Sequence, residues 1–418
     1  MNFEPRPENP FPKYIETYFT RCQAVCPKLR AIAGKWTFED LIPGLSDFDA
    51  RLIFADGVTV DEWSSMSIAV GKVHTELAKE VPGWARILEH LPGLNLAVGE
   101  LTNPRFFYPE FQQWSYYLGD DGTIETIRGY LKEKPWTDRD EFFHLKKFSV
   151  YFGPYQRGID PAVNIGPWES KYPLHSRFMH YFCPPVQSAV SLVRRRGIAG
   201  KLDALRQARE IFPNPDVIDM ILEAVNRHYE APEYYAEPRL TQIERQLEAY
   251  LRDVYRVLAD HVTLIRIDPA DEPEDLKAKV AAVQTDPVQR FYEGVKFSRF
   301  MKGRLLFYAT PIAWFDTRWL IGIELGRIVP NFYTQPLKTF GLIRYKESLS
   351  PEQVLSRLEG RELPADICAT YRQFAELAAR PLEDGKEKQR AFEVAQIFDS
   401  VQIVIEALGD LLYRELEY

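Results

Sequence analysis

The sequence predicts an α+β protein in which a small mixed sheet near the N-terminus is followed by mainly helical domains. Three observations predict this class. The short apolar run Ala50–Ala55 lies between two turn-forming pairs, Pro43-Gly44 and Asp56-Gly57, which is typical of a strand. Segments before and after it carry apolar residues three and four apart, the spacing of an amphipathic helix. Strand and helix in alternation imply a layered α/β arrangement near the N-terminus.

Length, composition and charge restrict the class of protein. A chain of 418 residues corresponds to two or three domains of about 100 to 200 residues each. The hydrophobic content of 45% and charged content of 27% are those of an ordinary soluble globular protein. The net charge of −8 opposes nucleic-acid binding, because such proteins usually need a basic face to neutralise phosphates. It favours cationic or neutral small-molecule partners.

The sequence also predicts a cytoplasmic protein with no membrane partner. No N-terminal segment combines the basic start and apolar middle of a signal peptide, and no apolar run is long enough to span a bilayer. The four cysteines lack metal-ligand spacing and fit reduced, buried thiols.

The N-terminal elements follow in order. Residues 1–29 predict a Pro-rich lead-in and then one helix, because apolar residues recur three and four apart from Tyr14 to Leu29. After the Ala50–Ala55 strand, a second amphipathic segment runs from about Val60 to Leu91. The next strand is predicted over Leu94–Leu101, since turn-forming pairs bound it on both sides.

The stretch Ser46-Asp47-Phe48-Asp49 leads directly into the first predicted strand. Side chains two apart on a strand share a face, so Asp47 and Asp49 converge on one point. Mg²⁺ is typically held by one or two carboxylates together with substrate phosphates. The pair therefore predicts a Mg²⁺ site. The alternative is a turn whose two carboxylates are merely solvated.

Gly34 and the loop that ends in Ser46-Asp47-x-Asp49 resemble the nucleotidyltransferase signature of the polymerase-β superfamily. The resemblance implies a nucleotidyltransferase domain over residues 30–125, ATP as the nucleotide donor, and Mg²⁺ held by Asp47 and Asp49. It also implies nucleotide contacts from Gly34, Lys35 and Ser46.

Two positions of this loop depart from the family. Lys35 stands where the family has Ser, and Glu39 stands where many members have Gly. The first change removes a hydroxyl that helps to hold the nucleotide phosphates, although a Lys binds phosphate as a point charge.

The resemblance extends, in the form of the streptomycin and spectinomycin 3''-adenylyltransferases, from Leu94–Leu101 through Tyr108-Pro109 to Gly119-Asp120. It implies a third acid that acts as general base, but that position is Asn95, which cannot take a proton. Glu100 is the remaining candidate for the base. Its odd spacing from Asn95 places it on the opposite face of an undistorted strand, and a bulge at Gly99 would restore it.

Residues 126–173 predict a connecting region of turns and short aromatic strands such as Lys147–Phe152. Residues 174–267 predict a helical domain, in which Arg194–Tyr229 resembles the helical domain of the same adenylyltransferases. The resemblance places Lys201 and Tyr229 at nucleotide contacts. Without it, a solvated lysine at a helix start describes Lys201 equally well.

The resemblance ends before residues 276–418, a mainly helical C-terminal extension for which the sequence predicts no role. A long helix, Arg239–Ile267, precedes an acidic linker that leads into it. The aromatic stretch Arg304–Gly326 is most typical of core, and a pocket wall or a partner-binding surface is the alternative. Ala375–Tyr418 predicts two helices split near Pro381.

The function predicted from the sequence is Mg²⁺-dependent transfer of a nucleotide, AMP from ATP, to a hydroxyl of a small-molecule acceptor. The alternative is a nucleotidyltransferase-like protein that binds nucleotide or a partner without turnover. Three substitutions motivate the alternative, namely Lys35, Glu39 and Asn95 in place of the family's residues.

Overall fold

The computed structural model describes residues 9–35, 37–43, 46, 48–84, 95–155, 177–227, 237–283, 286–310 and 317–416. Two residues predicted for the site, Asp47 and Tyr229, lie outside the described residues, as does the end of the predicted helix before Leu91. Within these ranges, no helix is long and apolar enough to cross a membrane.

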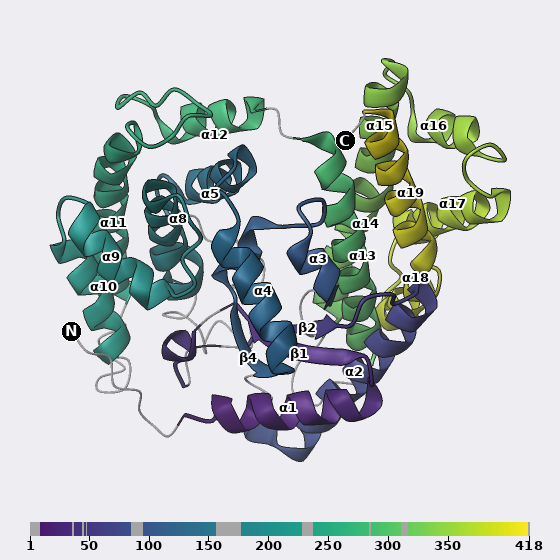
Figure 1. Ribbon diagram of the computed structural model, residues 1–418, viewed down its shortest axis with the longest axis horizontal. Coiled ribbons are helices and arrows are strands. Elements are labelled where there is room, and N and C mark those ends of the chain that lie inside the picture. The colour runs from purple at the N-terminus through teal and green to yellow at the C-terminus, as the bar shows by residue number, and fades with distance from the viewer. Residues whose placement is uncertain are drawn as a thin grey trace.

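A small mixed sheet lies at the centre of the molecule (Figure 1). Its strands are β1 Leu29–Gly34, β2 Ala50–Phe54, β3 Leu96–Ala97 and β4 Ser115–Gly119, in the spatial order β3-β2-β1-β4. Strand β1 pairs antiparallel with both β2 and β4, and β2 pairs parallel with β3. Helices make up most of the rest, so the predicted α+β class with a small mixed sheet is confirmed.

Alternate residues of the strands face two different layers, as the period of two requires. Leu52 and Phe54 pack on one face against α1 Phe11–Val25 and α2 Val60–Glu80. Ile53 packs on the other face. That face is covered by α3 Val98–Thr102, η3 Pro109–Gln113 and α4 Asp121–Glu133.

The strand predicted over Leu94–Leu101 is wrong beyond Ala97, because α3 begins at Val98. The Glu100 carboxylate reaches back and accepts the Ala97 backbone N–H at 2.7 Å, which satisfies a donor that the helix start leaves without an intrahelical partner. The Gly99 N–H donates to Asp56 Oδ1, also at 2.7 Å, which fixes α3 beside the end of β2.

The strand predicted over Lys147–Phe152 is also wrong, since these residues belong largely to helix α5, Asp138–Tyr151. Leu145 and Phe148 are buried one turn apart, so the aromatic residues follow a helical period. At the helix start, Asp140 accepts the N–H of Thr137 at 2.9 Å and forms a capping box with it.

A helical layer packs on one side of the sheet (Figure 1). It comprises η5 Arg177–Phe182, α8 Cys183–Arg194, α9 Lys201–Ile211, α10 Asp216–Arg227, α11 Glu237–Leu258 and α12 Pro273–Ala282. The described residues between 177 and 258 are therefore mainly helical. Helix α11 ends at Leu258, well before the predicted Ile267, in a turn where the His261 N–H donates to Leu258 O at 3.0 Å.

The C-terminal helices form a separate core on the other side of the sheet (Figure 1). They are α13 Pro287–Ala309, α14 Arg318–Val329, η7 Pro330–Thr334, α15 Gln335–Tyr345, α16 Pro351–Leu358, α17 Ala365–Ala379, α18 Glu387–Gln396 and α19 Asp399–Glu415. The break predicted near Pro381 separates α17 from α18. A second break, at Ile397 and Phe398, separates α18 from α19 and was not predicted.

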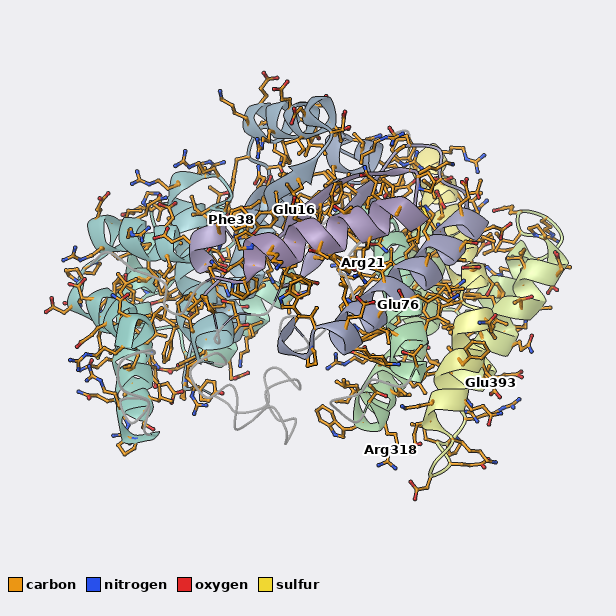
Figure 2. All side chains as sticks on the ribbon, turned by 90° about the horizontal axis from the view of Figure 1, so that it is seen from below. Glu16, Arg21, Phe38, Glu76, Arg318 and Glu393 are labelled. Carbon is orange, nitrogen blue, oxygen red and sulfur yellow. The ribbon has the colours of Figure 1, made fainter. Side chains whose placement is uncertain are left out.

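Helix α13 joins the C-terminal core to the sheet domain through an ion pair and a hydrogen bond. Arg299 donates to Glu100 of α3 at 2.9 Å, and Lys302 donates to Ser64 of α2 at 2.6 Å and to Asp399 of α19 at 2.8 Å. Seen from below in Figure 2, Phe38 lies on the side of the first helical layer and Arg318 on the side of the C-terminal helices. The sheet and its loops therefore lie between two helical walls.

Candidate functional site

The loop between β1 and β2 is tied to helix α9 by a buried carboxylate. Asp40, in η1 Phe38–Asp40, accepts the backbone N–H groups of Lys201 at 3.0 Å and Leu202 at 2.9 Å. These are the first two residues of α9, so Asp40 caps that helix from a distant part of the chain. Burial raises the pKa of Asp40 despite these donors. The cap places Lys201 beside the loop that carries the predicted site.

The same loop uses two other predicted residues in its own structure. The Ser46 hydroxyl donates to Asp40 O at 2.8 Å and accepts the Ile42 N–H at 3.0 Å. A Cβ at Gly34 would lie 2.7 Å from ring atoms of both Phe48 and Tyr117, so the aromatic packing itself requires glycine here. Nucleotide contacts from Gly34 and Ser46 stay predictions.

Glu39, one of the departures from the family pattern, also connects the loop to α9. Its carboxylate accepts from Arg206, with Oε2 at 3.0 Å from Nη1. Both side chains are well exposed, so this pair contributes little to stability. It adds a second contact between the loop and the helix that carries Lys201.

Asp49 is the last residue before β2, and its side chain is 27% exposed. Arg51 lies two residues later on the same strand face and is buried. Its Nη2 is 3.9 Å from Asp49 Oδ2 and 3.6 Å from Glu110 Oε1. One guanidinium nitrogen therefore brings two carboxylates together at the start of β2.

Glu110 is a candidate site residue that the sequence analysis missed. It lies in η3, and its Oε1 accepts the Trp114 indole N–H at 3.2 Å. Burial alone would raise its pKa, but the charges of Lys35, Arg51 and Lys147 hold the pKa of Glu110 at about 2. It is thus a carboxylate at any physiological pH. The available signal was an acid directly after Tyr108-Pro109, within the stretch that carries the family resemblance.

Three lysines form what we call the lysine cluster: Lys35 after β1, Lys147 in α5 and Lys201 in α9. Lys201 is fully buried, and burial together with the charges of Lys35 and Lys147 lowers its pKa well below the ordinary value. Burial and the charge of Lys35 lower the pKa of Lys147 to about 7. Each ammonium group therefore lies within electrostatic reach of the other two. Such a concentration of positive charge favours an anionic ligand.

The sequence does not identify Lys147 as a site residue either, because residues 147–152 are predicted as a strand of a connecting region. In the helix, Lys147 Nζ lies 3.5 Å from Gln113 Oε1 of η3, on the same side as Glu110. The capping residues Thr137 and Asp140 were the sequence signal that would have identified the helix.

Glu100, the predicted general base, is committed to another contact. Besides capping α3, its carboxylate accepts from Arg299 of α13. Burial would raise its pKa, but the charges of Arg299 and Lys296 hold the pKa of Glu100 below the ordinary value. Among the contacts recorded for the described residues, none joins Glu100 to Asp49. Asn95 is buried, and its Oδ1 lacks a hydrogen-bond partner within the same residues.

The oxygen donors at the start of β2 fit Mg²⁺, since Asp49 is partly exposed and Glu110 is permanently ionised. In the part of the chain that the structure describes, which leaves out Asp47, no three His, Cys, Asp or Glu side chains are close enough to hold a metal ion together. The metal site therefore stays a prediction that depends on Asp47.

Comparisons of the chain with protein-family models, with curated proteins and with solved structures found no match.

Proposed function

We propose that the protein is a nucleotidyltransferase that binds MgATP between Asp49 and the lysine cluster and transfers AMP to a hydroxyl group of a small molecule. The observation that carries the proposal is the lysine cluster itself. Lys35, Lys147 and Lys201 come from three separate elements beside the loop that leads to Asp49, and the charge of Lys35 helps to lower the pKa values of Lys147 and Lys201. A triphosphate would relieve this repulsion by placing negative charge among the three ammonium groups.

Each part of the site has a task in this reaction. The lysine cluster binds the β- and γ-phosphates, and Asp47 and Asp49 would hold the metal. Bound Mg²⁺ would supply charge neutralisation on the phosphates and lower the pKa of the acceptor hydroxyl. Arg51 orients the carboxylate of Asp49. In the transfer, the acceptor oxygen bonds to the α-phosphorus, the bond to the bridging oxygen breaks, pyrophosphate leaves with that electron pair, and the hydroxyl proton passes to water.

A second candidate function is nucleotide binding without turnover. One specific observation favours it, namely that Glu100 pairs with Arg299 while Asn95 occupies the position of the family's base. The lysine cluster would serve a binding protein equally well, so the two candidates differ only in whether pyrophosphate is released.

The test has two parts. Calorimetry with MgATP should give binding by the wild-type protein and at least a tenfold loss of affinity in the Asp47→Ala/Asp49→Ala variant, because the metal loses its carboxylate ligands. Pyrophosphate release is then measured across a panel of hydroxylated small molecules. Release with an acceptor supports the transferase. Binding without release from any acceptor supports the second candidate, and absence of MgATP binding eliminates both.

A further inference from the structure

The C-terminal extension contributes a second wall near Asp49, which we call the α13–α14 wall and define by Arg304, Tyr308 and Glu324. Arg304 of α13 donates to Glu324 of α14 at 2.5 Å, and Glu324 is 4% exposed. The Arg304 guanidinium lies 4.1 Å from the centre of the Phe300 ring. Phe300 in turn packs on the sheet face formed by Ile53 and its neighbours. Helix α13 thus runs along the sheet with Arg304 one turn beyond Phe300.

Packing places this wall against β2, because Phe300, one turn before Arg304, lies on the face of the strand that carries Ile53. Burial would lower the pKa of Arg304, but the charges of Tyr308, Glu324 and Asp49 raise it. The C-terminal extension therefore contributes charged side chains beside the strand that Asp49 precedes.

Two buried donors of the wall lack a hydrogen-bond partner among the described residues: Arg304 Nε and the Tyr308 hydroxyl. A buried donor left unpaired costs about 1–3 kcal/mol, so such groups are usually satisfied by a bound water or a ligand. The Tyr308 carbonyl accepts from Thr317 Oγ1 at 2.8 Å, which fixes the end of α13 against the residue before α14. The unpaired donors are consequently held in place rather than left to rotate into solvent.

The two walls lie on opposite sides of the sheet. Figure 1 shows α5 and α9, which carry Lys147 and Lys201, on one side and α13 and α14 on the other. Nucleotidyl transfer is an in-line displacement, in which the attacking and leaving oxygens lie on opposite sides of the phosphorus. If pyrophosphate leaves towards the lysine cluster, the acceptor must attack from the side of α13 and α14.

We propose that Arg304, Tyr308 and Glu324 form the acceptor subsite and bind a neutral, polyhydroxylated molecule. The inference rests on the proposed function and names its acceptor. Arg304 and Glu324 neutralise each other, so the wall offers no net charge to select a cation or an anion. A carboxylate accepts hydrogen bonds, whereas a guanidinium and a phenol donate them. A hydroxyl group does both, and several on one molecule would match this set.

Calorimetry on the full chain measures separately how the lysine cluster and the α13–α14 wall contribute to ligand binding. Wild type, Lys201→Gln, Tyr308→Phe and Glu324→Gln are first titrated with MgATP. Lys201→Gln should lose at least tenfold in affinity, while both α13–α14 variants should stay within about twofold of wild type. Each protein is then saturated with Mg²⁺ and a non-hydrolysable ATP analogue and titrated with myo-inositol, sorbitol or glucose. At least one polyol should bind, and the α13–α14 variants should weaken it about tenfold.

Three results discriminate among the possibilities. If wild type fails to bind MgATP, the proposed function is overturned as a whole. If MgATP binds but Tyr308→Phe or Glu324→Gln weakens it as much as Lys201→Gln does, or if the saturated protein binds no polyol and binds the cationic kanamycin instead, the acceptor subsite is overturned. Glu324→Gln leaves Arg304 without its counter-charge and risks unfolding, so Tyr308→Phe, which removes only an unpaired hydroxyl, is the decisive variant.

Discussion

The lysine cluster and the α13–α14 wall lie on opposite sides of the sheet and differ in charge balance. In the lysine cluster, the pKa values of Lys147 and Lys201 are lowered by burial and by the charge of Lys35. In the α13–α14 wall, a single Arg304 is matched by Glu324. On the proposed function, charge balance, more than residue type, distinguishes the side that would bind a polyphosphate from the side that would bind a neutral molecule.

The two walls are also attached to the sheet domain in different ways. Helix α9 is held through its own backbone N–H groups, which donate to the buried Asp40. Helix α13 is held by side-chain ion pairs such as Arg299 with Glu100. A backbone cap fixes the helix start itself, whereas an ion pair leaves several rotatable bonds between the elements. We therefore expect the position of Lys201 in the lysine cluster to depend strongly on Asp40.

Asp40→Ala should have the largest effect. It removes the acceptor of the Lys201 and Leu202 N–H groups and of Thr37, so several buried donors lose their partner. We expect a loss of roughly 3 kcal/mol in the free energy of unfolding. Urea denaturation measures it. The matched control is Glu39→Ala, next in sequence, which breaks only an exposed ion pair and should cost less than about 1 kcal/mol. Equal losses in the two variants would contradict the role of Asp40.

Lys201→Gln should have the next largest effect, on nucleotide affinity. In the proposed complex the buried ammonium group of Lys201 would face the triphosphate, so its removal should weaken MgATP binding about 10- to 100-fold. Arg209→Gln is the control on the same helix, because Arg209 is half-exposed and pairs with Asp219 away from the lysine cluster. Calorimetry at constant ionic strength compares them. A loss in Arg209→Gln as large as that in Lys201→Gln would show a non-specific charge effect.

The pH dependence of MgATP binding should be smaller and follow Lys147. In the free protein its pKa is about 7, and a bound triphosphate raises that pKa because it stabilises the ammonium form. Binding therefore takes up a proton above pH 7, and affinity should fall about tenfold between pH 6 and pH 8. Titrations in buffers of different ionisation enthalpy measure the uptake. Lys147→Arg keeps the charge at all these pH values, so the dependence should flatten. An unchanged pH profile would exclude Lys147.

Glu100→Gln should have the smallest effect on nucleotide affinity, within about twofold of wild type. The Glu100 side chain caps α3 and pairs with Arg299 of α13. Its loss should therefore weaken the contact between the sheet domain and the C-terminal extension. Stability should fall instead, because buried Arg299 loses its carboxylate. Thermal unfolding and MgATP calorimetry on the same samples separate the two outcomes. A tenfold loss of MgATP affinity without a change in stability would contradict this expectation and indicate that Glu100 contributes to nucleotide binding.

Part of this arrangement was predictable from the sequence. The strand after Asp49 follows from a short apolar run between turns, and Lys201 at the start of a helix follows from the pattern around it. The α+β class followed from the same periodicities. These features depend on local spacing, which a single sequence contains.

The rest depends on contacts between distant residues. The sequence does not indicate that Asp40 caps a helix that begins at Lys201, that Glu110 meets Arg51, or that Arg304 pairs with Glu324. The sequence predicts a strand at Glu100 because turn-forming pairs bound Leu94–Leu101, whereas the structure uses the Glu100 carboxylate to cap the start of a helix. Short apolar runs are ambiguous in this way, and long-range pairing decides them.

A crystal structure with Mg²⁺ and a non-hydrolysable ATP analogue would show where the nucleotide binds. We expect the β- and γ-phosphates within hydrogen-bonding distance of Lys35, Lys147 and Lys201, the metal on Asp47 and Asp49, and the α-phosphate open towards Arg304 and Tyr308. Phosphates bound against the α13–α14 wall, with the lysine cluster unchanged, would contradict this binding mode.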